Sequence, residues 1–337
     1  MQFKRMEELR PGMRLARPIY NKSGVMLFDR DSKITAQGIQ NIANFGLIGL
    51  FILEPAEPCP PLSDEDREFE IFQTVNVFSL MDEVAKINGQ GKSAKFQMIV
   101  ANIIKSYGHL ENKINFNQNL RSEEDARYKH ALNVAILVAM MCNKLNVRVE
   151  DRLDVVSSAL LHGNVSPEVV ERMFASDPNV KRYINQAEAI NTGAEKGVME
   201  NSIKLMDGGK ILAVADTYDN LTAMRIDSEP ESELAAVKYM LDRPGIYENR
   251  VVMSLIDSIN ILVPGISVEL NTGSKALVLS ENRTDFFRPL VLCFDTNEVI
   301  DLSNRSTYGD LEIVDIMKSM DNRHVINSDM LNSMGMN

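Results

Sequence analysis

Residues from about 66 to 260 carry apolar side chains at every third or fourth position over several long segments. This spacing is typical of amphipathic helices that pack on a shared core. The segments lie at Glu68–Lys86, Ser93–Ser106, Ser122–Leu145, Asp151–His162, Lys210–Met224 and about 247–262. The sequence therefore predicts a mainly α protein whose largest part is a bundle of helices.

A proline-rich and acidic segment precedes these helices. It holds four prolines between Pro55 and Pro61, followed by an acidic run that ends at Asp66. Proline lacks a backbone donor and favours extended conformations, so this segment is not expected to pack as a helix. We predict a domain boundary here, with an N-terminal module over 1–55, a linker over 56–66 and the helical domain over 67–263.

Short runs with the composition of β-strands flank the helical domain on both sides. In the N-terminal module they lie at Met13–Ile19, Gly24–Phe28 and Leu47–Leu53, beside a helix over 36–45 that Thr35 would cap. After Pro264 they lie at Ser267–Leu270, Ala276–Ser280, Leu290–Phe294 and Val299–Leu302. The sequence thus predicts a small β-rich N-terminal module and a β-rich C-terminal extension with a tail over 264–337.

Charge and composition exclude several classes of protein. The net charge of −11 argues against a nucleic-acid partner, because such partners are bound through lysine and arginine. The three cysteines (Cys59, Cys142 and Cys293) are too far apart for a disulfide framework or a zinc cluster, which fits a reducing compartment. The first residues form no signal peptide, and no apolar run is long enough to cross a bilayer. We expect a cytoplasmic protein without a membrane segment.

Three polar residues lie on the apolar faces of different predicted helices. His130 shares its face with Leu137, His162 ends the helix over 151–162, and Asp216 lies on a face with the small residues Gly209 and Ala213. A buried carboxylate needs a metal, a cation or hydrogen bonds. Two inward histidines and one inward aspartate could hold a divalent metal ion.

The same residues also have a purely structural interpretation. Gly163 is a good residue to end a helix, which makes His162 an ordinary capping or core histidine. His130 and Asp216 could simply hydrogen-bond each other. Asp219, one turn further along, is expected to bond locally within its own helix rather than to ligate.

The order of these motifs resembles the HD superfamily of metal-dependent phosphohydrolases. It is more closely similar to the HD-GYP branch, the cyclic di-GMP phosphodiesterases. The matching pieces are His130-x-x-Asn-Val-Ala, Ala159-Leu-Leu-His-Gly and Val214-Ala-Asp-Thr-Tyr-Asp-Asn-Leu-Thr. The resemblance covers most of residues 122–263 and implies an HD-type helical bundle. Residues 12–27 and 263–273 also look like the modules that flank such domains.

Several ligand positions of the family are changed in this chain. Gly163 stands where the family has the aspartate of its His-Asp pair, and the lysine that follows in the family is absent. The segment over 168–185 contains no histidine, Gln186-Ala187-Glu188 replaces His-His-Glu, and Gly193-Ala194-Glu195 replaces Gly-Tyr-Pro. The resemblance therefore implies His130, His162 and Asp216 as remnant metal ligands for at most one divalent ion, and no catalytic residues.

Two functions are compatible with this degenerate motif set. The first is a non-catalytic HD-GYP-like signalling module that acts through protein contacts, with cyclic dinucleotide binding left open. The resemblance implies a signalling partner such as a diguanylate cyclase or a response regulator, and a homodimer also stays open. The alternative is a residual single-metal phosphohydrolase that uses His130, His162 and Asp216 on cyclic di-GMP or another nucleotide.

Overall fold

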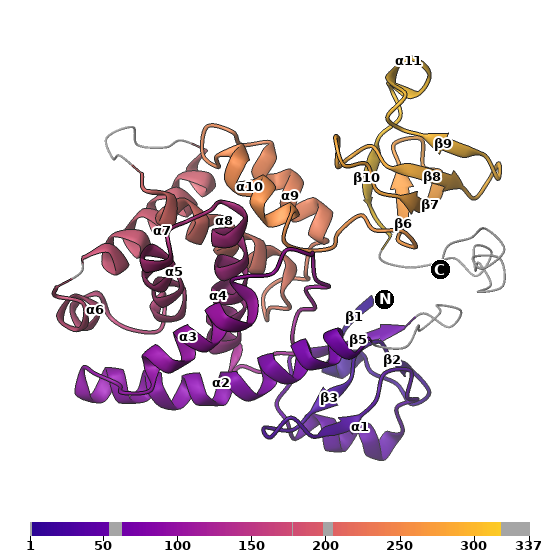
Figure 1. The fold of residues 1–337 in the computed structure, drawn as a ribbon. Helices are drawn as coiled ribbons and strands as arrows, with labels where there is room; N and C mark the ends of the chain where they lie inside the picture. Colours follow the sequence, from indigo (N-terminus) through magenta and orange to yellow (C-terminus); the bar gives the residue numbers. More distant parts are fainter. Residues whose placement is uncertain (1, 54–62, 177, 198–204, 318–337) are drawn as a thin grey trace. The chain divides into compact units, whose positions relative to one another are not determined.

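A computed structural model describes residues 2–53, 63–176, 178–197 and 205–317 (Figure 1). The chain divides into two compact units. One is the helical unit, formed by residues 62–261 together with the short segment 20–25. The other takes in residues 1–19, 26–61 and 262–337.

The helical unit confirms the expected mainly α architecture. Its helices are α2 (Asp64–Gln90), α3 (Phe96–Tyr107), α4 (Ala126–Lys144), α5 (Val149–Leu161), α6 (Pro167–Met173), α7 (Asn179–Lys196), α8 (Asp207–Thr222), α9 (Glu233–Leu241) and α10 (Asn249–Ile256). The helices α6, α7 and α9 were not predicted. The helix expected over 247–262 ends at Ile256, because Ile259 instead forms a parallel β-bridge with Ile114. None of the helices in the described ranges has both the length and the apolar character that crossing a membrane requires.

Helix α4 forms the centre of this unit. It packs against α2, α3, α5, α8 and α10, and every residue from Ala131 to Cys142 is buried. A helix that is apolar on all sides needs neighbours on all sides, which explains this position. His130 lies directly before the buried block, so its side chain is held near the helices that pack on α4.

Helices α7 and α8 approach each other closely because of two glycines at the start of α8. A Cβ atom at Gly208 would lie 2.7 Å from the ring of Tyr183, and one at Gly209 would lie 2.6 Å from Oε1 of Gln186. Both Tyr183 and Gln186 belong to α7. The small residues predicted on the Asp216 face therefore do permit close helix packing.

The acidic run expected in the linker belongs instead to α2. Asp64, Glu65 and Asp66 form its first turn, and the Ser63 hydroxyl accepts a hydrogen bond from the Asp66 amide at 3.0 Å. Carboxylates are favourable near the positive end of a helix, so the run starts a helix rather than extending a linker. The prolines of the predicted linker lie outside the described residues.

The N-terminal part contains a three-stranded antiparallel sheet in the order β1-β5-β2. Its elements are β1 (Gln2–Arg5), a 3-10 turn (Met6–Glu8), β2 (Arg14–Leu15), β3 (Ile19–Tyr20), β4 (Met26–Phe28), α1 (Ala36–Ala43) and β5 (Gly49–Leu53). Thr35 caps α1 as predicted, accepting a hydrogen bond from the Gly38 amide. Strand β1 was not predicted, and β3 and β4 form a separate hairpin.

The C-terminal part is a five-stranded antiparallel sheet in the order β10-β6-β7-β8-β9. Its elements are β6 (Ser267–Leu270), β7 (Lys275–Ser280), β8 (Leu290–Cys293), β9 (Val299–Asp301), α11 (Arg305–Tyr308) and β10 (Ile313–Ile316). The predicted strands are confirmed, and β10 is an addition. Residues 318–337, the end of the predicted extension and tail, lie outside the described residues, as does Cys59.

Candidate metal centre

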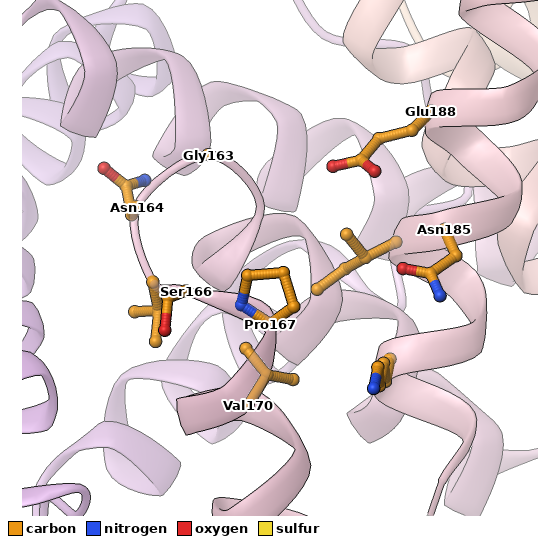
Figure 2. Close-up of a pocket in the computed structure, with 10 residues that line it drawn as sticks. Gly163, Asn164, Ser166, Pro167, Val170, Asn185 and Glu188 are labelled. Carbon is orange, nitrogen blue, oxygen red and sulfur yellow. The ribbon is translucent and has the colours of Figure 1, made fainter.

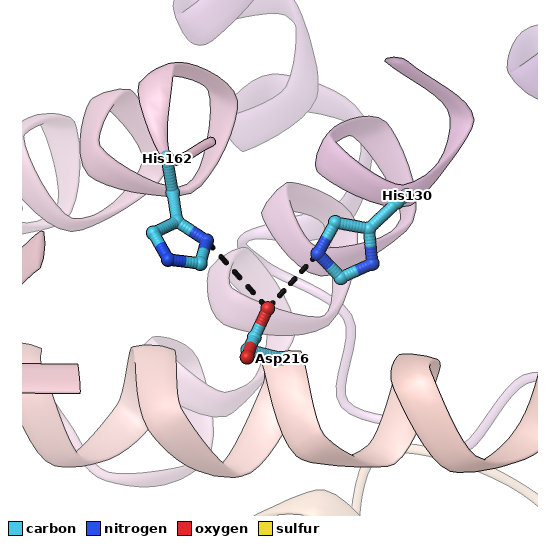
Figure 3. A group of neighbouring side chains, drawn as sticks. All are labelled: His130, His162 and Asp216. Carbon is cyan, nitrogen blue, oxygen red and sulfur yellow. Dashed lines mark hydrogen bonds and ion pairs between the residues drawn. The ribbon is translucent and has the colours of Figure 1, made fainter. Parts of the chain in front are cut away.

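Three helices bring the predicted ligands together. His130 lies in the first turns of α4, His162 directly follows the last residue of α5, and Asp216 lies in the middle of α8 (Figure 3). Asp216 Oδ1 is 2.9 Å from Nε2 of His130 and 3.6 Å from Nδ1 of His162. One ligand atom from each of the three residues lies within 4.8 Å of the others.

The end of α5 sets the position of His162. His162 is the C-cap residue of α5: its amide donates to the Ser158 carbonyl, and Gly163 follows with φ of +67°. A left-handed residue after the C-cap is a common way to end a helix, and glycine adopts it without strain. A Cβ atom at Gly163 would meet nothing within 4 Å, so the backbone conformation, rather than a lack of space, accounts for this glycine.

The Asp216 carboxylate is hydrogen-bonded on both oxygens. Asn191 of α7 donates to Asp216 Oδ2 at 2.6 Å, while His130 bonds to Oδ1. The side-chain oxygen of Asn191, Oδ1, in turn accepts a hydrogen bond from the Thr217 hydroxyl at 3.0 Å. This hydroxyl also bonds with the Tyr247 hydroxyl at 3.0 Å. These contacts fix the side-chain amide of Asn191 so that its nitrogen, Nδ2, faces Asp216.

His130 is held between two carboxylates. Its Nε2 lies 2.9 Å from Asp216 Oδ1 and its Nδ1 lies 2.7 Å from Asp219 Oδ2. Burial alone would lower the pKa of His130, but the hydrogen bonds to Asp216 and Asp219 outweigh burial and raise the pKa to about 9. At neutral pH the ring is therefore an imidazolium that donates to both carboxylates.

Asp219 corrects one sequence-based expectation. It is fully buried, and its side chain bonds to residues outside its own helix: Nη2 of Arg121 lies 2.6 and 2.9 Å from its two oxygens, and Asn133 donates to it at 2.9 Å. Burial would raise the pKa of Asp219, but the Arg121 guanidinium and His130 hold it well below its usual range. The local expectation failed because Arg121 comes from a loop almost a hundred residues earlier in the chain.

A buried amide network supports this ion pair from the other side. Gln73 of α2 donates to Asn133 Oδ1 at 2.9 Å, and Asn133 donates to Gln118 Oε1 at 2.9 Å. Gln118 donates to the Thr222 hydroxyl at 2.8 Å. The contacts between these residues were not predicted from the sequence, although Asn133 in an otherwise apolar stretch of α4 was a signal for a buried polar partner.

The outer side of His162 faces α7, where Glu188 also lines a pocket. Nε2 of His162 lies 3.7 Å from Oε1 of Glu188, whose side chain is 58% exposed. Figure 2 shows Glu188 and Asn185 projecting from α7 beside the loop that follows Gly163. The pocket measures about 290 Å³, and its polar lining includes Ser166, Lys181, Asn185 and Glu188.

The donor set fits a single divalent ion. Two ligand atoms that each lie about 2.1 Å from one ion can be at most about 4.2 Å apart. The distances from Asp216 Oδ1 to the facing nitrogens of His130 and His162, 2.9 and 3.6 Å, meet this limit. All three ligand atoms lie within 4.8 Å of one another, so the two histidines need to move together only slightly to hold one ion. Within the described part of the chain, His130, His162 and Asp216 form a group of three side chains that could ligate a metal. Three ligands suit at most one ion.

Comparisons with known proteins give one likeness. No protein-family model matches the chain, and no curated protein matches it. Among solved structures, the chain is similar to Bd1817, an HDG"Y"P protein from Bdellovibrio bacteriovorus, with a TM-score of 0.42 and 16% identity. The match covers 76% of this chain and 98% of that one.

Proposed function

We propose that this chain is a non-catalytic HD-GYP-like signalling module that acts through binding. The observation that carries the proposal is the donor set of the centre: two histidines and one aspartate, with Gly163 where the family has the aspartate of its His-Asp pair. A hydrolytic centre of this type uses two or more ions to activate water and to neutralise the phosphate. Glycine has no side chain, so it cannot bridge two ions.

The internal ion pairs support the same proposal. His130, as an imidazolium, neutralises charge on Asp216 and Asp219, and Arg121 neutralises Asp219 as well. Buried charges that are paired and hydrogen-bonded can favour one specific packing of the helices that carry them. In this proposal the former active site has become a structural connection between α4, α5, α7 and α8.

The proposed ligand is a protein in a signalling pathway, with a diguanylate cyclase or a response regulator as candidates. This part of the proposal rests on the resemblance of the sequence motifs to the HD-GYP family. Binding of a cyclic dinucleotide without hydrolysis is compatible with it. We also propose a cytoplasmic location, which the cysteine usage supports.

A residual single-metal phosphohydrolase is the second candidate. Two observations favour it: the ligand atoms of His130, His162 and Asp216 lie within 4.8 Å of one another, and a pocket of about 290 Å³ lies beside Glu188. When bound, a single ion would supply a Lewis acid and a more acidic water molecule. The chain itself would hold that ion through the three ligands and place Lys181 at the pocket.

A hydrolysis assay separates these two candidates. The purified protein, loaded with Mn²⁺ or Fe²⁺, is incubated with cyclic di-GMP beside the His162→Ala variant, and elemental analysis gives the metal content of both. We expect no turnover above the level of the variant. Metal-dependent turnover that disappears in His162→Ala would establish the phosphohydrolase and overturn the proposal.

A further inference from the structure

Each histidine of the centre has a carboxylate at the ring nitrogen that faces away from Asp216. His130 turns Nε2 toward Asp216 and Nδ1 toward Asp219. His162 turns Nδ1 toward Asp216 and Nε2 toward Glu188. The two histidines therefore use opposite nitrogens for the centre, and each has an acidic partner on the other nitrogen.

This arrangement has a defined role in metal sites. A metal-ligating histidine usually donates its second ring N–H to a carboxylate, a carbonyl or water, which fixes the tautomer and the ring orientation and makes the ligating nitrogen more basic. Loss of such a partner typically lowers metal affinity by about 10- to 100-fold. Asp219 and Glu188 occupy this outer position for His130 and His162.

The two outer carboxylates differ in environment. Asp219 is fully buried, lies 2.7 Å from His130 and is clamped by Arg121. Glu188 is 58% exposed and lies 3.7 Å from His162. An exposed side chain on one face of α7 can close such a gap by a change of rotamer, because no packed neighbour has to move.

We propose that Glu188 is a positioning residue that selects the tautomer of His162 for a single divalent ion. By accepting Nε2–H, Glu188 leaves the lone pair of Nδ1 directed at Asp216 and at the ion. His130 supplies Nε2 as the second nitrogen when the ion displaces the proton of this nitrogen to solvent, and Asp216 supplies the oxygen. This inference rests on the proposed single-ion donor set, and it assigns to Glu188 a role that the centre's three ligands do not include.

Cobalt binding to the full chain tests the proposal. Co²⁺ is titrated into metal-free wild-type protein and the variants Glu188→Ala, Glu188→Gln and Asp216→Asn, and affinity is read from the visible absorption of the bound ion. The matched control is Glu195→Ala, which removes an exposed carboxylate from the same helix, two turns further along. We expect Glu188→Ala to weaken binding by about 10- to 100-fold. Glu188→Gln, which keeps an acceptor oxygen, should have a smaller effect, and Glu195→Ala should match the wild type.

The tautomer of His162 gives a second readout that a merely structural role would not change. Long-range proton–nitrogen NMR spectra of the metal-free protein at mildly alkaline pH distinguish protonated Nε2 from protonated Nδ1. We expect protonated Nε2 in the wild type and in Glu195→Ala, and a shift toward protonated Nδ1 in Glu188→Ala.

Two results would overturn the proposal. One is a wild-type protein that binds Co²⁺ no better than Asp216→Asn. The other is a Glu188→Ala variant that matches Glu195→Ala in both affinity and tautomer. Neither result bears on the proposed non-catalytic function, which the hydrolysis of cyclic di-GMP tests separately.

Discussion

At the residue scale, the centre is organised around two acidic residues one turn apart on α8. Asp216 faces the two histidines, and Asp219 faces the interior, where it pairs with Arg121. Removing one partner of a buried ion pair is costly because the other charge remains buried and uncompensated. The two aspartates should therefore contribute differently to stability, although they occupy the same helix.

The first prediction compares these aspartates by urea unfolding. Asp219→Ala leaves the Arg121 guanidinium buried without its carboxylate, so we expect a loss of about 3–5 kcal/mol in the free energy of unfolding. Asp216→Ala leaves hydrogen-bonding groups unsatisfied at a less buried position, so we expect a loss of about 1–3 kcal/mol. Asp82→Ala, at an exposed position of α2, serves as the control and should change little. Equal losses for the two aspartates would contradict the assigned contacts.

The second prediction concerns pH. The pKa of His130 is raised to about 9 in the folded protein, whereas an unfolded histidine has a pKa of about 6.5. The folded state therefore holds this proton more tightly, and its stabilising contribution is fully present below about pH 6.5. It decreases as the pH rises toward 9 and is lost above that value.

Thermal unfolding across this pH range provides the measurement. We expect the wild-type Tm to fall between neutral pH and pH about 9 by more than the Tm of His130→Gln, which has no titrating ring. Parallel pH profiles for the two proteins would show that His130 does not hold its extra proton.

At the element scale, the close approach of α7 and α8 brings Asn191 to Asp216. Gly208 and Gly209 permit this approach, because side chains at these positions would collide with Tyr183 and Gln186. The buried side chains of Tyr183 and Gln186 therefore leave no room for larger residues where α7 and α8 meet. Packing, rather than helix propensity, determines which residues are acceptable there.

The third prediction compares two glycine-to-alanine substitutions within helices. Gly208→Ala should destabilise the protein by about 1–3 kcal/mol, because the new Cβ would lie 2.7 Å from the Tyr183 ring. Gly89→Ala in α2 should stabilise the protein by about 0.5–1 kcal/mol, since its Cβ would meet no atom within 4 Å and alanine favours helices. Chemical denaturation measures both, and a stabilising Gly208→Ala would show that α7 and α8 are less closely packed.

At the scale of the whole molecule, the division of the chain does not follow the sequence order. Residues 20–25, which are the last residue of β3 and the turn after it, belong to the helical unit, although β4 does not. Within that unit the Tyr20 hydroxyl bonds to Glu70 at 3.1 Å, and Gly24 lies beside Ile71 and Val75 of α2. The predicted boundary between residues 1–55 and the helical domain thus has an exception of six residues.

The fourth prediction concerns the proline-rich segment. The helical unit has its own buried core around α4, so it should withstand cleavage of the connection that precedes it. Limited proteolysis of the full chain should cut first between Glu54 and Arg67 and leave a stable fragment that extends past Phe294. First cleavage inside 122–225, identified by mass spectrometry, would contradict the predicted boundary.

The sequence alone determined the elements whose signal is local. The apolar spacing of the residues predicted the helices α2, α3, α4, α5 and α8. The residue types of Thr35 and Gly163 predicted the start of α1 and the end of α5. The inward positions of His130, His162 and Asp216 were also predicted, because the face of a helix follows from residue spacing. Strand β1, by contrast, is short and carries two charged residues, so its composition gave little indication of a strand.

Only the tertiary structure decided which groups satisfy these buried residues. Arg121, Asn191 and Glu188 lie on a loop and on a helix whose positions relative to α4 and α8 depend on packing across the whole unit. The role of Asp219 changed for this reason, from a local hydrogen-bonding residue to the buried partner of Arg121 and His130. Spacing along a chain determines the direction in which a side chain points, but the neighbour it meets depends on contacts between residues far apart in sequence.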